Sequence, residues 1–148
     1  MRLGFVLVAV IASMAAADDC FGDPYNTGSP KWDDPNSQKI IEKLLIMKCE
    51  DGTFNGAYGD GHQSRDKAYV ISNLSNRKVY MEIKHIKGGD RDLPDYECKS
   101  GLTKELKNCP YGGAKQYKNW SYRAQPYDET MYEAEFYNHP TETITVDV

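Results

Sequence analysis

The chain has 148 residues, 40% of them hydrophobic, so it is long enough to fold as one domain around its own core. It carries 18 Lys and Arg residues against 22 Asp and Glu residues, a net charge of -4 with neutral histidines. This acidic balance argues against non-specific binding to nucleic acid or to anionic membranes, because both select basic proteins.

Residues 1–17 have the pattern of a secretory signal peptide. Arg2 supplies the positive charge, an apolar run follows at residues 3–14, and residues 15–17 are small alanines of the kind that signal peptidase accepts. The apolar run is shorter than the roughly 20 residues that a membrane-spanning helix needs. We therefore expect a secreted protein with no membrane partner, consisting of a single disulfide-stabilised domain over residues 18–148.

The first predicted element is a helix that follows the proline-rich, turn-forming segment at residues 21–36. Asp34 fits the N-cap and Pro35 the first helical turn. An apolar face recurs at helical spacing and should pack on a sheet; its members are Ile40, Ile41, Leu44 and Leu45. The glycine-rich residues 50–66 predict a loop with room for a short hairpin.

Strands are expected in the second half of the chain. Two flank a polar turn, at residues 68–72 and 78–86, and Val79, Met81 and Ile83 alternate with polar neighbours as in an antiparallel strand buried on one face. Further strands are predicted at residues 120–124, 131–137 and 143–148, with a single helical turn at residues 102–108. The expected fold class is α+β, with one helix packed on a short-stranded antiparallel β-sheet.

Four cysteines lie after the predicted leader: Cys20, Cys49, Cys98 and Cys109. An even number of cysteines in an exported chain predicts two disulfides. The spacing of Cys98 and Cys109 is neither the short C-x(2-4)-C of zinc sites nor the C-x-x-C of redox sites, so we assign them no metal and no cofactor. Three pairings are possible, and the sequence does not choose among them.

Two N-x-S/T sequons mark Asn73 and Asn119 as candidate N-glycosylation sites. The first falls in the predicted turn between two strands, where a glycan is easily accommodated. The second borders a predicted strand that begins at Trp120. Chance occurrence is the alternative explanation for both sequons.

No catalytic motif is present: the sequence has no G-x-S-x-G elbow, no H-E-x-x-H and no phosphate-binding loop, and we assign no catalytic residue. The predicted element order resembles that of the microbial guanyl-specific ribonucleases, which leaves a small ribonuclease-like or ribotoxin-like hydrolase as an alternative. Such an enzyme would need a carboxylate with histidines and a cation on the phosphate; the candidates are Glu82, His85, His139, and either Lys84 or Arg91 as the cation. Glu82 and His85 should point to opposite faces of one strand, so we predict that this set does not assemble.

Charge is unevenly distributed in the C-terminal half. Residues 99–123 hold six basic residues and one acid, whereas residues 124–148 hold six acids and no Lys or Arg. Tyrosines and a tryptophan are interleaved with the lysines, and exposed aromatics are common at interfaces. We predict a partner surface at Lys104, Lys107, Lys115, Lys118 and Trp120, with an ordinary solvated surface and buried aromatics as the alternative.

The stretch NCPYGGAKQYKNWSYRAQPYD, residues 108–128, resembles a segment of small secreted, cysteine-containing, effector-like proteins of filamentous fungi. The matching positions are Cys109, Gly112, Gly113, Trp120, Arg123, Ala124 and Pro126, and a further cysteine after Pro126 is lacking. The resemblance implies a virulence protein that binds a host or competitor macromolecule without catalysis, either outside the producing cell or inside a host cell. A cell-wall glycan-binding or antimicrobial protein is a further alternative.

Overall fold

The structure, a computed structural model, describes residues 20–21, 31–32, 34–127 and 141–148. It has the predicted α+β class and two disulfides. The elements in chain order are α1 (Pro35–Glu50), β1 (Gly56–Tyr58), β2 (Ser64–Ile71), β3 (Arg77–His85), β4 (Arg91–Leu93), α2 (Asp95–Asn108), β5 (Gly113–Gln116), β6 (Trp120–Tyr127) and β7 (Thr141–Ile144). The predicted leader and the strand predicted at residues 131–137 lie outside the described residues.

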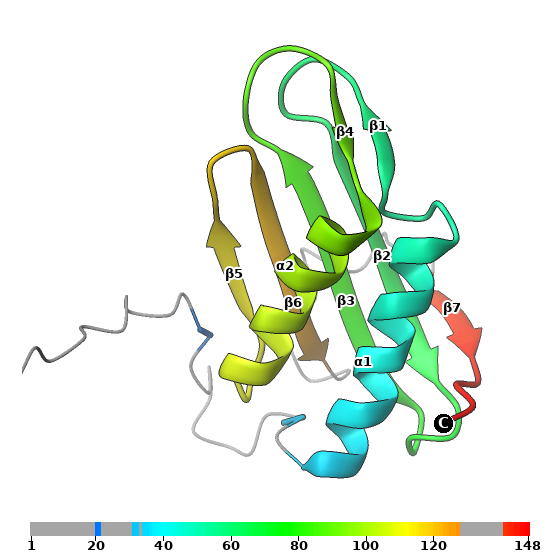
Figure 1. Cartoon of the computed structure of the whole chain (residues 1–148). Coiled ribbons are helices and arrows are strands. Elements are labelled where there is room, and N and C mark those ends of the chain that lie inside the picture. Colours follow the sequence, from blue (N-terminus) through cyan, green and yellow to red (C-terminus); the bar gives the residue numbers. More distant parts are fainter. Residues whose placement is uncertain (1–19, 22–30, 33, 128–140) are drawn as a thin grey trace, which may run out of the picture.

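Five strands form one sheet in the order β5-β6-β3-β2-β7, and both helices lie on the same side of it (Figure 1). Neighbouring strands are antiparallel except at one edge, where β7 runs parallel to β2. The predicted antiparallel sheet is confirmed for β2, β3, β5 and β6, and β7 adds a parallel strand at one edge. Alternating apolar residues indicate a strand in either direction, so the pattern carries no information about its orientation.

Helix α1 forms as its sequence predicts. The Asp34 carboxylate accepts a hydrogen bond from the Ser37 backbone N–H at 2.8 Å, and a proline occupies the first turn. The four predicted apolar residues are buried, each no more than 3% exposed. This face packs in one cluster with Val79, Met81 and Ile83 of β3, so the predicted burial of both faces is confirmed.

The second helix was not predicted in full. α2 extends over fourteen residues, where the sequence indicated only one turn at residues 102–108. Its buried face repeats at three-to-four-residue spacing, but only Leu102 and Leu106 are large apolar residues, and Gly101 and the buried Glu105 weaken the pattern. Two acids in the first turn, Asp95 and Glu97, interact favourably with the positive end of the helix dipole.

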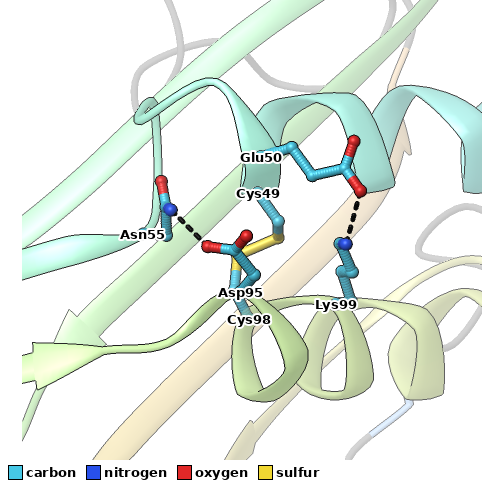
Figure 2. A network of polar contacts seen from close by, with 6 residues as sticks. All are labelled: Cys49, Glu50, Asn55, Asp95, Cys98 and Lys99. Atoms are coloured by element: carbon cyan, nitrogen blue, oxygen red, sulfur yellow. Dashed lines mark hydrogen bonds and ion pairs between the residues drawn. A yellow bond between two sulfur atoms is a disulfide. The ribbon is translucent and has the colours of Figure 1, made fainter.

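A disulfide between Cys49 and Cys98 joins the C-terminal end of α1 to the first turns of α2. Figure 2 shows two polar contacts on either side of it, Lys99 with Glu50 and Asn55 with Asp95. Both cysteines are fully buried, whereas the polar contacts are exposed and contribute little alone. The crosslink therefore sets how the two helices lie against each other.

The second disulfide joins Cys20 to Cys109, so Cys98 and Cys109 each reach back to an earlier part of the chain. Cys20 also forms a β-bridge with Gly113, and the Trp32 indole N–H donates to the Cys109 carbonyl at 2.7 Å. These contacts attach the N-terminal segment to the start of β5. A disulfide that closes a loop of this length stabilises a fold by about 2–5 kcal/mol.

Residues 50–66, predicted as a loop with room for a hairpin, contain β1. This strand pairs with the distant β4 rather than with its own neighbour, from Gly56 opposite Leu93 to Tyr58 opposite Arg91. The small sheet lies beside the end of β3, where Tyr58 and Leu93 enter the core. The loop around His62 and the turn that precedes β6 both hydrogen-bond to the chain at the end of β3, at His85 and Ile86.

Candidate functional site

The five residues predicted as a partner surface lie in different environments. Lys104 is an exposed residue of α2, and Lys118 is an exposed residue of the turn between β5 and β6. Lys107 makes an ion pair with Glu42 of α1 at 2.8 Å, and Lys115 is half-buried on β5 opposite Tyr122. The structure thus places Lys104 and Lys118 on accessible surface and directs Lys107 toward the other helix.

Trp120 does not belong to the surface, and its inclusion in the predicted contact patch is corrected here. Its side chain is 1% exposed. The indole packs edge-on against the Tyr58 ring, with centroids 4.9 Å apart, and against the His85 ring at 5.0 Å. Trp120 starts β6 opposite His85, whose side chain faces the core, so the strand register directs the indole inward.

A cavity of about 320 Å³ opens between the first half of α2 and strand β6. We call it the tyrosine cavity; its walls are Tyr96, Glu97, Ser100, Gly101, Lys104, Tyr117 and Tyr122. Tyr96 is 74% exposed at the rim, whereas Tyr122 is 2% exposed. The Lys104 ammonium lies 5.2 Å from the centre of the Tyr117 ring, which itself stands edge-on to the Tyr122 ring at 5.7 Å.

A second cavity, of about 520 Å³, also has Tyr117 in its wall. We call it the lysine cavity; it is lined by His62, Lys84, Ile86, Lys87, Gln116, Tyr117 and Lys118. No described acidic side chain makes an ion pair with Lys84, Lys87 or Lys118. Three cations that form no ion pair with a described acidic residue therefore line one concave surface.

The two cavities meet at Tyr117, and we refer to them together as the Tyr117 groove. Backbone hydrogen bonds fix the three segments that form its basic half. The N–H of His62 donates to the His85 carbonyl and that of Ile86 to the Asn119 carbonyl, each at 2.9 Å, and the N–H of Tyr117 donates to the Trp120 carbonyl at 2.7 Å. The lysine cavity is therefore formed before any ligand arrives.

Electrostatics differ between the two halves of the groove. Burial raises the pKa of the Tyr122 hydroxyl, and the nearby Glu97 carboxylate raises it further. This hydroxyl is buried and has no hydrogen-bond partner among the described residues. The Glu97 carboxylate also lacks an ion pair with any described side chain. The tyrosine cavity thus combines flat aromatic rings with an acceptor carboxylate, next to a purely cationic half.

His62 occupies a backbone conformation that only glycine adopts freely, with φ of 69°. Such a conformation costs free energy and is often found where a loop has to present a side chain. Here it lies in the loop before β2, held by the hydrogen bond from its N–H to the His85 carbonyl. The strained residue is one of the walls of the lysine cavity.

Much of this groove was not predicted. Tyr96, Glu97 and Ser100 were missed because the first half of α2 was not recognised, and the helix is what aligns them along one wall. Lys84 was assigned to the polar face of a strand and His62 to a loop, and Lys87 was given no assignment; only the tertiary fold brings these three together. The one sequence signal was the density of lysine and tyrosine around Tyr117.

The residues considered for a ribonuclease-like site do not assemble among the described residues. His85 is fully buried, with its Nδ1 atom 3.1 Å from the Gly59 carbonyl oxygen. Glu82 lies on the opposite face of β3, where the Tyr80 hydroxyl contacts it at 3.4 Å. This is the arrangement predicted from the alternation of the strand. His139 lies outside the described residues.

The two candidate glycosylation sites differ in how their side chains are used. The Asn73 amide donates to the Val146 carbonyl at 2.8 Å and accepts from the Val146 N–H at 3.2 Å, so it binds the chain after β7. Asn119 is half-buried in the turn between β5 and β6, next to Lys118. Attachment of a glycan remains a prediction for both.

Within the described ranges, no group of three or more His, Cys, Asp or Glu side chains is placed to hold a metal ion. Polar residues in the glycine-rich segment instead stabilise turns: Asp51 accepts from the Thr53 N–H at 2.9 Å, and Asp60 accepts from the Gly89 N–H. The described helices also include none with the length and apolarity needed to cross a membrane.

Neither a protein-family model nor a curated protein sequence matches this chain, so the proposed function is argued from the sequence and the structure.

Proposed function

We propose that this protein is a secreted, effector-like interaction protein that binds a host or competitor macromolecule through the Tyr117 groove, without catalysing a reaction. The observation that carries the proposal is the meeting, at Tyr117, of an aromatic cavity and a cavity lined by three lysines that have no ion-pair partner among the described residues. Unneutralised charge at a preformed concave surface is available to a ligand.

Export is part of the proposal. The leader pattern at residues 1–17 supports it, and so do two disulfides, which persist in oxidising compartments and are rare in the cytosol. The resemblance of residues 108–128 to effector-like proteins of filamentous fungi supports the same role. Detection of the processed protein in culture medium, with residue 18 as its first residue, tests this part directly.

Complementation tests the contact surface. A strain of the producing organism that lacks the gene would be complemented with the wild-type protein, with the double variant Tyr96→Ala/Lys118→Ala, or with Lys39→Ala/Lys43→Ala as a matched control. The control lysines are exposed on α1 and line neither cavity. We expect the control, but not the groove variant, to restore growth on the host or against the competitor. Full restoration by the groove variant would contradict the proposal.

An RNA-degradation assay separates the non-enzymatic proposal from the hydrolase alternative. Purified protein is expected to leave RNA intact. A His85→Ala variant is a poor control here because the buried ring packs on Trp120 and its loss would disturb the core. Glu82→Gln, on the opposite face, is better suited. If the wild type cleaves RNA and the Glu82→Gln variant does not, the non-enzymatic assignment is refuted.

A further inference from the structure

The chemistry of the Tyr117 groove narrows the class of ligand. Its aromatic half offers the rings of Tyr96, Tyr117 and Tyr122 around a volume of about 320 Å³, enough for one or two six-membered rings. Gly101 contributes only backbone to this wall, so the Tyr122 ring lies close against the helix. A flat aromatic surface of this kind accommodates a planar ring or the C–H face of a sugar.

The polar groups of this half favour a ligand that donates hydrogen bonds. The Glu97 carboxylate is an acceptor only, it is half-buried, and no described side chain is paired with it. Ser100 is exposed on the next turn of the same helix face. Hydroxyl groups on a sugar ring would satisfy the carboxylate and so offset the cost of covering it.

The basic half requires negative charge on the same ligand. Lys84, Lys87 and Lys118 line a cavity of about 520 Å³ that shares Tyr117 with the aromatic half. A ligand that reaches from one half to the other must therefore carry a ring with hydroxyl groups at one end and anionic groups at the other. In an acidic oligosaccharide each ring carries hydroxyl groups on one edge and an anionic group on another, so the hydroxyl groups of one ring can face Glu97 while anionic groups lie toward the lysines.

Two other classes of macromolecule fit these observations less well. The cores of protein interfaces are depleted in Lys and Glu, which here form most of the charged walls, and Tyr96 is the one strongly exposed aromatic among the described residues. Single-stranded nucleic acid would stack on tyrosines, but a stacked base offers the Glu97 carboxylate fewer hydrogen-bond donors than the several hydroxyl groups of a sugar ring.

We propose that the Tyr117 groove binds an acidic oligosaccharide, with one sugar ring in the tyrosine cavity and its carboxylate or sulfate groups on the lysines of the lysine cavity. The assignment rests on the proposed function, since it names the ligand of the same surface. The sugar ring stacks on Tyr117 or Tyr96 while its hydroxyl groups donate to Glu97. The anionic groups of the neighbouring sugars contact Lys84 and Lys118.

Isothermal titration calorimetry with defined probes tests this assignment. The probes are a hexamer of galacturonic acid, its fully methyl-esterified form, a sulfated hexasaccharide, inorganic polyphosphate and a single-stranded RNA hexamer. We expect binding of the galacturonate hexamer or the sulfated hexasaccharide, and the relative affinity of these two identifies the anionic group. The methyl ester should bind at least about tenfold more weakly than the galacturonate hexamer if carboxylate is the group recognised.

Two exposed residues provide variants that should leave the fold intact. Tyr96→Ala and Lys118→Gln are each expected to weaken binding by about tenfold or more, whereas Lys39→Gln/Lys43→Gln should change it by less than about twofold. Thermal melting of each variant verifies folding. The proposal is overturned if neither acidic saccharide binds, if polyphosphate or RNA binds as tightly, or if both groove variants bind like the wild type.

The outcome can be separated from that of the proposed function. Loss of complementation by Tyr96→Ala/Lys118→Ala without any saccharide binding would overturn only the ligand assignment. The opposite result is also informative: the groove variants could abolish saccharide binding while Tyr96→Ala/Lys118→Ala still complements fully. This result would overturn the role of the groove in the organism and leave the binding site in place.

Discussion

The ring of Tyr122 lies directly against the backbone of α2 at Gly101. A Cβ atom at this position would come within 2.3 to 2.5 Å of three ring carbons, so the helix can approach β6 this closely only because residue 101 has no side chain. Both residues form walls of the tyrosine cavity. This close contact between α2 and the sheet therefore also shapes the candidate site.

Substitution Gly101→Ala is expected to destabilise the protein. Alanine favours the helix by about 1 kcal/mol, but forcing the Tyr122 ring away costs about 1–3 kcal/mol, so the net loss should reach up to about 2 kcal/mol. Urea unfolding measures the change, with Ser100→Ala on the neighbouring exposed position as the control. A Gly101→Ala protein more stable than the wild type would show that the ring can move aside freely.

Two buried tyrosines differ in how their hydroxyl groups are used, and this difference is measurable. The Tyr58 hydroxyl donates to the Phe54 carbonyl at 2.6 Å, whereas the Tyr122 hydroxyl has no partner among the described residues. Tyr58→Phe should lower the free energy of unfolding by about 1 kcal/mol, and Tyr122→Phe should leave it unchanged or raise it by up to about 1 kcal/mol. Equal losses in the two variants would mean that Tyr122 is hydrogen-bonded in solution.

The N-cap of α1 gives a pH dependence with a defined sign. The hydrogen bonds from Ser37 hold the pKa of the Asp34 carboxyl below its ordinary value of 3.8. Its stabilising contribution is therefore complete above pH 3.8 and is lost as the pH falls through the lower, folded-state pKa. Unfolding of wild type and Asp34→Asn should show a gap in stability at pH 6 that closes by about pH 2. A gap independent of pH would contradict this account.

Asn73 connects the turn after β2 to the chain after β7 through both atoms of its amide. A glycan replaces one of the two hydrogens on Nδ2. Because a secondary amide is trans, the sugar takes the position on the same side as the amide oxygen. That position is held by the N–H that donates to Val146, so the glycan would remove this hydrogen bond. Glycosylation of Asn73 and its pair of hydrogen bonds with Val146, which we call the Asn73 clamp, therefore exclude each other. Asn73→Asp, which removes the donor, should cost about 1–2 kcal/mol and increase hydrogen exchange at the Val146 amide.

Production in a glycosylating host tests whether glycosylation breaks the hydrogen bonds between Asn73 and Val146, without substituting Asn73 itself. Where Asn73 carries a glycan, Ser75→Ala removes the sequon and should raise stability by about 1–2 kcal/mol relative to the glycosylated wild type. The unglycosylated wild type and unglycosylated Ser75→Ala proteins, compared with each other, provide the control. A glycosylated wild type that is as stable as the sequon variant would show that the amide contact is not needed.

Local patterns in the sequence predicted the elements whose signals are strong. The cap at Asp34, the apolar face of α1 and the alternation in β3 were sufficient because each depends on residues close together in the chain. α2 was underpredicted because its buried face uses Cys98 and Gly101, which carry little apolar signal alone. The parallel direction of β7 and the pairing of Cys49 with Cys98 depend on contacts between distant segments.

The same distinction applies to the candidate site. Lys104 and Lys118 were predicted because they lie in a segment dense in lysine and tyrosine. Trp120 was placed wrongly, since only the strand register opposite His85 directs its indole into the core. His62, Lys84 and Lys87 come from three different parts of the chain, and no local pattern shows that they share a cavity.

The central claim is that ligand contact takes place in the Tyr117 groove, and amide chemical-shift mapping tests it most directly. Uniformly ¹⁵N-labelled protein would be titrated with the galacturonate hexamer while backbone amide shifts are recorded. We predict that the shifted amides cluster around Tyr117, from the first turns of α2 to Lys84 and Lys87. Shifts confined to the other edge and end of the sheet, around β7 and the turn between β2 and β3, would contradict the account.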